Sequence, residues 1–163
     1  MRKVLIRCVP VGARVQRGVA AIELAIGMVM ILLITAGIVE FGRAFWYYNA
    51  LDKATRDAAR YLSAVPVVEM TDAVQAAAAI TTAKNMVVEA VNDANVSPAI
   101  TMTNVVVSCN AACGDDVKPV SVTVSITGFA ILIGGLFPFV SGAANGNYGD
   151  IGLSPHTTMP YMN

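Results

Sequence analysis

The longest hydrophobic pattern in the chain is an apolar stretch near the N-terminus, from Gly18 to Val39. It contains one charged residue, Glu23, and no proline. Apolar residues would occupy every face of a helix here, so the pattern is not that of a soluble amphipathic helix. As a helix the stretch would span about 33 Å, enough to cross a bilayer core of about 30 Å. The pattern therefore predicts one membrane-spanning helix.

The predicted helix continues beyond the apolar stretch, because no proline occurs until Pro66. We expect one long helix over residues 19–63, with its first half in the membrane. Four consecutive aromatic residues follow the apolar stretch and suit a lipid headgroup interface. They are Phe45, Trp46, Tyr47 and Tyr48.

A second helix is predicted after Thr71 or Asp72, either of which is a suitable N-cap, and should end at Asn92 or Asp93. It is rich in alanine. The side chains expected on its packed face are Val74, Ala77, Ala78, Met86, Val87 and Ala90.

The pattern then changes to the period of two that is typical of strands. Residues 120–127 alternate apolar and hydroxyl side chains without an error, and residues 99–109 are the expected antiparallel partner. A third strand is predicted over residues 151–162. Pro155 and Pro160 should restrict it to a sheet edge or a bulged path.

Residues 128–150 fit no single pattern, although they include an apolar run, residues 129–140, that is too short to cross a bilayer. This run suits either a loop packed on the sheet or an exposed patch that meets a partner. The fold class predicted for the whole chain is α+β. A long N-terminal transmembrane helix and an alanine-rich helix accompany a small antiparallel sheet of about three strands.

The charges are unevenly distributed, although the 163 residues include 11 basic and 11 acidic ones. The first 18 residues contain five basic residues and no acidic one: Arg2, Lys3, Arg7, Arg14 and Arg17. A basic segment beside a membrane span indicates a cytoplasmic N-terminus. The rest of the chain is acidic, which argues against nucleic-acid binding.

Glu23 is the anomaly of the apolar stretch, because a carboxylate in hydrocarbon costs about 2.5–3.5 kcal/mol on insertion scales. It can lie near the interface and remain hydrated. Alternatively, a peptidase that cuts between Gly18 and Val19 would create a cationic α-amine. In a stack of such helices, the amine of one subunit could neutralise Glu23 of its neighbour and set the axial register.

Three segments, residues 17–25, 38–44 and 50–61, resemble the TadE-like family, the minor pseudopilins of the Tad/Flp type IVb pilus system. The resemblance implies cleavage by the prepilin peptidase between Gly18 and Val19. Leu24 stands where the major Flp pilin has tyrosine, which favours the minor branch.

The resemblance also implies a layout and a set of partners. Residues 1–18 would be a cleaved cytoplasmic leader, residues 19–63 a pilin-type helix, and residues 64–163 a periplasmic α+β head. The location would be the bacterial inner membrane, with one span and possible incorporation into an extracellular pilus. Expected partners are other pilins and pseudopilins, the prepilin peptidase, the lipid bilayer, and the inner-membrane assembly platform with its ATPase.

The three cysteines divide by position. Cys8 would leave with the leader, whereas Cys109 and Cys113 lie in the predicted connection between two strands. In an oxidising periplasm a disulfide is the default for this pair, with free thiols or a metal site as alternatives.

No catalytic or cofactor-binding motif is recognisable, and the single histidine, His156, suits a surface position. We therefore expect no enzyme activity, no cofactor and no metal. Two alternatives to a pseudopilin are an unprocessed single-span envelope or adhesion module and a soluble protein secreted by a signal peptide cut near Gly37. The N-terminal residue of the mature protein, Val19, Met1 or one near Ile38, distinguishes the three.

Overall fold

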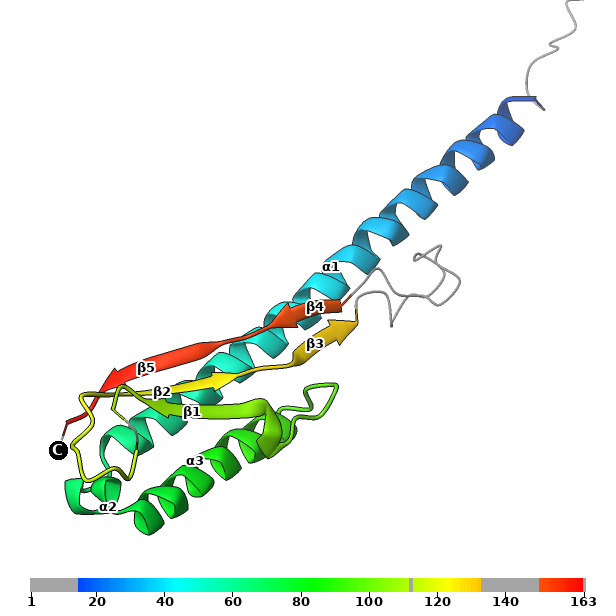
Figure 1. Ribbon diagram of the computed structural model, residues 1–163. Coiled ribbons are helices and arrows are strands. Elements are labelled where there is room, and N and C mark those ends of the chain that lie inside the picture. Colours follow the sequence, from blue (N-terminus) through cyan, green and yellow to red (C-terminus); the bar gives the residue numbers. More distant parts are fainter. Residues whose placement is uncertain (1–14, 112, 133–149, 163) are drawn as a thin grey trace, which may run out of the picture. The chain divides into compact units, whose positions relative to one another are not determined.

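The computed structural model describes residues 15–111, 113–132 and 150–162 (Figure 1). Most of the predicted leader and the central part of residues 128–150 lie outside the described residues. The helices are α1 (Val15–Ser63), α2 (Val67–Thr71), α3 (Ala73–Asp93) and a short 3-10 helix (Met102–Asn104). The strands are β1 (Val105–Cys109), β2 (Ser121–Ile126), β3 (Phe129–Leu132), β4 (Asp150–Leu153) and β5 (His156–Pro160).

The predicted α+β fold is confirmed, with a three-stranded antiparallel sheet in the order β1-β2-β5. Val107 of β1 pairs with Val124 of the central strand β2, which pairs in turn with Thr157 of β5. The apolar side chains of β2 are buried and its hydroxyl side chains are partly exposed, as the alternation predicts. The third predicted strand is divided at Ser154 and Pro155 into β4 and β5, and β5 lies at the sheet edge.

Strand β3 was not predicted, and it pairs with β4 in a separate two-stranded sheet. Phe129 and Ile131 of β3 are buried in the hydrophobic core. This part of the ambiguous apolar run is therefore neither a loop nor an exposed patch. A short apolar run without alternation is also consistent with a buried strand, which is what Phe129–Leu132 form.

The chain forms two compact units, an N-terminal unit over Met1–Val39 and a C-terminal unit over Glu40–Asn163. The core of the C-terminal unit combines the second part of α1 with α2, α3 and the sheet. Within this unit α1 and α3 run side by side, and the strands extend along them (Figure 1). Its largest fully buried apolar side chains include Leu51, Leu62, Met70, Val87, Val91, Val122, Val124 and Ile126.

The limits of α3 are as predicted. The Asp72 carboxylate accepts hydrogen bonds of 2.9 Å from the backbone N–H groups of Val74 and Gln75, which satisfies two donors at the helix start. The predicted packed face is wrong, however: of its six residues only Val87 is buried, and Val74 is 79% exposed. Alanine occurs on every side of α3, so the periodicity of the sequence alone could not identify the buried face. The buried stripe is Ala76, Ala79, Ala83, Val87 and Val91.

The C-terminus of the described chain is attached to the end of α1. The Tyr161 hydroxyl donates to the carbonyl oxygen of Val65, and the backbone N–H of Met162 donates to that of Ser63 at 3.2 Å. These bonds join the sequence after β5 to the point where α1 ends, as predicted, at Ser63.

Candidate functional site

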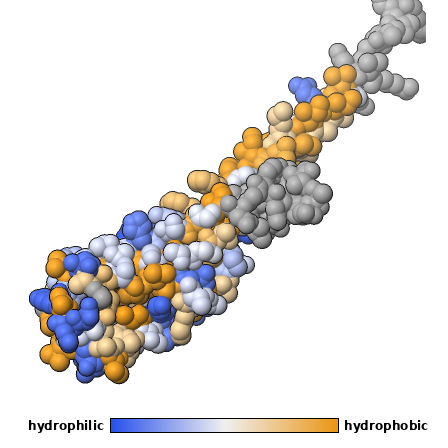
Figure 2. All heavy atoms as spheres, in the orientation of Figure 1, coloured by the Kyte–Doolittle hydropathy of each residue, from blue (hydrophilic) through white to orange (hydrophobic). Residues whose placement is uncertain are grey.

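The first candidate site is the surface of α1 in the N-terminal unit. From Val19 to Val39 every side chain except that of Ala36 is exposed, and Leu24 is 66% exposed. Figure 2 shows hydrophobic residues along this part of the helix. Among the described residues, α1 is the one helix long and apolar enough to cross a membrane, with a mean hydropathy of 2.5 in its span. Because so little of that apolar window is buried, this part of α1 is not packed in a core within the described residues; it fits a single-span membrane anchor.

Glu23 lies on this apolar surface beside a shallow hollow of about 380 Å³. Gly27, one helical turn further on, lines the hollow, and a side chain added there would meet nothing within 4 Å. No described residue forms an ion pair or hydrogen bond with Glu23. The carboxylate therefore lies on a surface that lipid or another helix must cover, with room next to it for a partner.

Gly18 and Val19, the predicted cleavage site, lie in the first turns of α1 and are exposed. The amine that would pair with Glu23 forms only after cleavage. Cleavage and pairing both stay predictions.

The four aromatic residues after the apolar stretch do not share one environment. Phe45, Trp46 and Tyr48 are exposed, whereas Tyr47 is only 8% exposed and belongs to the core. The Arg43 guanidinium lies 5.9 Å from the centre of the Tyr47 ring. Tyr47 therefore packs the second part of α1 into the core of the C-terminal unit, and an interfacial role stays a prediction for the other three.

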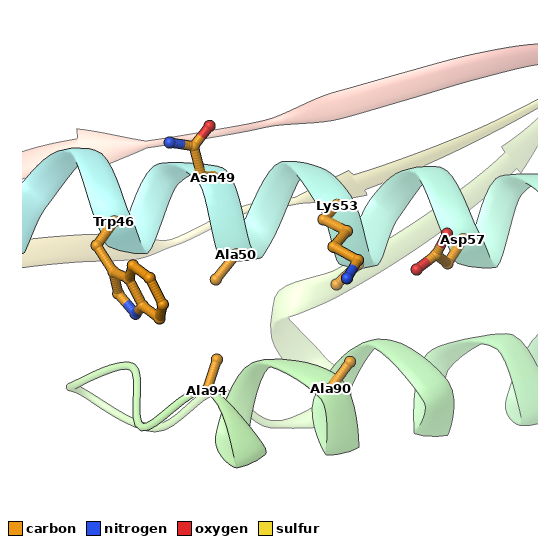
Figure 3. Close-up of a pocket in the computed structure, with 8 residues that line it drawn as sticks. Trp46, Asn49, Ala50, Lys53, Asp57, Ala90 and Ala94 are labelled. Carbon is orange, nitrogen blue, oxygen red and sulfur yellow. The ribbon is translucent and has the colours of Figure 1, made fainter.

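A second hollow, which the sequence did not indicate, lies between α1 and α3 of the C-terminal unit. It has a volume of about 400 Å³. Figure 3 shows Trp46 at one end, Lys53 and Asp57 toward the other, and alanines of both helices between them. The groove cannot be recognised in the sequence because its alanines come from two distant segments, and each segment alone has the pattern of ordinary helix packing.

A disulfide joins Cys109 to Cys113 across a Cα–Cα distance of 5.5 Å, which was the default expected for this pair in an oxidising compartment. It closes the start of the connection from β1 to β2. The backbone N–H of Gly114 then donates to the carbonyl oxygen of Met70 at 2.9 Å, so this connection contacts α2. Gly114 has a φ of +83°, and an added Cβ would lie 2.8 Å from the Ala73 backbone, so glycine is required there.

Metal-binding geometry is not found in the part of the chain that the structure describes, where no three His, Cys, Asp or Glu side chains gather. His156 is exposed on β5, opposite Ser125 of β2. Neither residue contacts the two hollows described above.

These features define a class of protein, in which a small α+β unit follows a single long apolar helix suited to membrane anchoring. Residues 18–60 match the family model described as TadE-like protein, which confirms the predicted resemblance. The match indicates a protein associated with the Tad pilus and with pilus proteins as partners. No curated protein and no solved structure matches the chain significantly.

Proposed function

We propose that this protein is a minor pseudopilin that takes part in assembly of a Tad/Flp type IVb pilus, by priming, capping or regulating it. It would do so by packing its N-terminal helix against other pilin subunits. The observation that carries the proposal is the exposed apolar surface of α1 from Val19 to Val39, with Glu23 on it, inside the segment that matches the TadE-like family. Such a surface requires lipid before assembly and can exchange lipid for neighbouring helices during it.

The proposed pathway begins with removal of residues 1–18 by the prepilin peptidase. The new amine of Val19, with an ordinary pKa of about 7.7–8.0, would be largely cationic at neutral pH. Pairing it with Glu23 of a neighbouring subunit compensates two charges that are costly when isolated in an apolar filament core. The inner-membrane platform and its ATPase would supply the energy for assembly.

The proposed orientation places the N-terminus in the cytoplasm and the C-terminal unit in the periplasm. The five basic residues before the span support the cytoplasmic end. The Cys109–Cys113 disulfide supports an oxidising compartment for the other end.

The decisive experiment compares Glu23→Ala with Glu89→Ala, which removes the same charge from an exposed position on α3. Membrane insertion and loss of the first 18 residues, followed by intact mass spectrometry, should be normal in both variants. Pilus yield should fall at least about tenfold in Glu23→Ala, a loss equivalent to about 1.4 kcal/mol of assembly energy, and stay normal in Glu89→Ala. Unchanged pilus yield in Glu23→Ala would refute the assembly role.

The same mass measurement tests the processing step. Loss of the leader should depend on co-expression of the prepilin peptidase. Retention of the leader in the presence of an active peptidase would instead favour an unprocessed membrane-anchored envelope or adhesion module. Cleavage near Gly37 would favour a secreted soluble protein, because that product lacks Glu23.

A further inference from the structure

Two stripes of side chains run along α1 in the C-terminal unit, and most of their members are exposed; Asp52, with 21% of its side chain exposed, and Ala50 are partly buried. The first stripe, which we call the ridge, consists of Phe41, Phe45, Tyr48, Asp52 and Arg56. Its spacings of four, three, four and four residues place these side chains on one helix face. Phe41 is 75% exposed, and the next two aromatic residues are exposed as well. An exposed aromatic row of this kind is typical of a docking surface.

The second stripe forms one wall of the groove between α1 and α3. It consists of Trp46, Ala50, Lys53 and Asp57, and the opposite wall contributes Ala90 and Ala94. Trp46 and the alanines point toward the space between the two helices in Figure 3. Small side chains at the bottom of a groove allow the side chains of another helix to approach closely. The groove, at about 400 Å³, has room for aromatic side chains.

We propose that the ridge of one copy of this chain docks in the groove of a second copy, with the two α1 helices parallel. Each charged or aromatic residue of the groove stripe comes one position after a ridge residue in the sequence. When one copy is shifted by one residue along the helix axis relative to the other, Phe45 of one ridge therefore meets Trp46 of the other copy's groove. The aromatic residues of the ridge then cover the alanines of the groove, and two exposed apolar surfaces are buried together.

The charges select the second copy and its direction. In the parallel arrangement, Lys53 of the groove faces Asp52 of the neighbour's ridge, and Asp57 faces Arg56. Both pairs are of opposite sign at the same one-residue shift. An antiparallel arrangement that keeps the first pair places Asp57 opposite Tyr48.

An antiparallel arrangement that keeps the second pair is worse, because it places Lys53 opposite Arg60, which has the same sign. The parallel direction is also the one that a single-span anchor imposes on two copies in one membrane. Within the ridge, Arg56 is already bonded to Asp52 at 2.6 Å, so its two charges are held in place before docking. Exposed pairs of this kind contribute selectivity more than affinity.

The ridge and the groove are different surfaces of the same helix, about 100° apart, so the contact pairs unlike residues of the two copies. Each charge pair joins a ridge residue of one copy to a groove residue of the other, and neither ridge meets ridge nor groove meets groove. The inference goes beyond the proposed function, since it requires neither leader cleavage nor Glu23.

The test is a reversal of all four charges in the full-length protein: Asp52→Lys, Lys53→Asp, Arg56→Asp and Asp57→Arg. In the reversed chain positions 52 and 56 still carry charges of opposite sign, so the ion pair within the helix is kept. The ridge of one reversed copy still complements the groove of another reversed copy. Against a wild-type copy, however, the reversed chain places like charges opposite each other. All copies also carry Glu23→Ala, so that the proposed pairing of Glu23 contributes nothing.

Two differently tagged copies are expressed in one membrane, and copurification in mild detergent is measured. Wild type with wild type and reversed with reversed should copurify, and the mixed pair should yield at least about tenfold less. Equal yields in all three combinations, or no copurification in any, would overturn the proposal. Equal yields would mean that the aromatic ridge serves a lipid interface or an unrelated contact.

A second measurement keeps the proposal testable if the reversed chain does not fold. In a Cys8→Ser background, one copy carries Asp52→Cys and the other carries Lys53→Cys. Oxidation should join these two copies, whereas two copies that both carry Lys53→Cys should give at least about tenfold less dimer, since groove does not face groove. Equal dimer formation in the two pairs would refute the arrangement.

Discussion

The two halves of α1 belong to one helix, but the side chains of the first half are exposed and part of the second half is buried in a core. From Val19 to Val39 its apolar side chains are exposed almost without exception. From Glu40 to Ser63 the helix buries one stripe in the core, where Leu51, Ala58 and Leu62 are completely covered. The first half has apolar side chains on all faces, whereas the second half has a polar face as well.

The difference shows which part of the chain buries its apolar side chains within its own fold. Each large apolar side chain removed from water contributes about 1.5–3 kcal/mol, and the second half gains this from its own C-terminal unit. The first half gains nothing of the kind within the described chain and must obtain it from lipid or from other helices. We therefore propose that the first half of α1, whose apolar surface the fold leaves exposed, makes the contacts with the membrane and the filament.

The largest expected difference in the free energy of unfolding is between the same leucine-to-alanine substitution made in each of the two halves. Leu51→Ala should lower the free energy of unfolding of the C-terminal unit by about 2–5 kcal/mol, because it leaves a cavity in the core. Leu32→Ala, at an exposed position of the first half, should change it by less than about 0.5 kcal/mol. Urea unfolding of the full chain in detergent, followed by near-ultraviolet circular dichroism, measures both.

An equal loss in the two variants would contradict the comparison. It would mean that the first half is also packed by the C-terminal unit, and its exposed surface would no longer require a membrane or a partner.

The next effect concerns the disulfide, which constrains only the second region. Replacing Cys109 and Cys113 with serine should lower the free energy of unfolding by about 2 kcal/mol, at the low end for disulfides because the closed loop is short. Membrane insertion should not change. In the unprocessed chain, produced without the prepilin peptidase, Cys8→Ser is the matched control, and a similar loss of stability in that variant would show that the effect is not due to the bridge.

Much of this fold was predictable where a single segment carries the whole signal. The end of α1 follows from the absence of proline before Pro66, and the start of α3 follows from the capping carboxylate of Asp72. Strand β2 follows from its alternation. The TadE-like resemblance of the first part of α1 was recognisable for the same reason, since its motifs are continuous in sequence.

The features that were not predictable depend on two segments at once. The buried face of α3 is set by what it packs against, and an alanine-rich sequence does not reveal that. Tyr47 differs from Trp46 only by a rotation of about 100° around α1, which turns its ring into the core. The groove requires alanines from both α1 and α3, which only the fold brings together.

A smaller effect is expected at the α3 N-cap. Asp72→Ala removes the acceptor for the Val74 and Gln75 N–H groups and should lower the free energy of unfolding by about 1 kcal/mol. Asp93→Ala, at the other end of α3, removes the same charge without removing a cap. It should leave the urea midpoint nearly unchanged. Equal shifts in the two variants would indicate a general charge effect instead of capping.

The smallest expected effect is the pH dependence contributed by Tyr161, whose pKa is raised above its usual value of 10.0 by burial, with a further contribution from the negative charge of Glu69. In the unfolded chain this tyrosine therefore loses its proton at lower pH than in the folded chain. Its contribution to stability is complete below pH 10.0 and is lost as the pH rises through the folded-state pKa.

Tyr161→Phe removes both this titration and the hydrogen bond to Val65, so the variant is less stable at neutral pH but should lose less stability above pH 10. Urea unfolding of both proteins between pH 8 and pH 11 isolates this contribution, because the two chains differ only in this hydroxyl group. Tyr61→Phe, at a more exposed position of α1, is the control and should follow the wild-type profile. If the Tyr161→Phe and wild-type curves stay parallel throughout, the buried phenol does not contribute to the alkaline loss of stability.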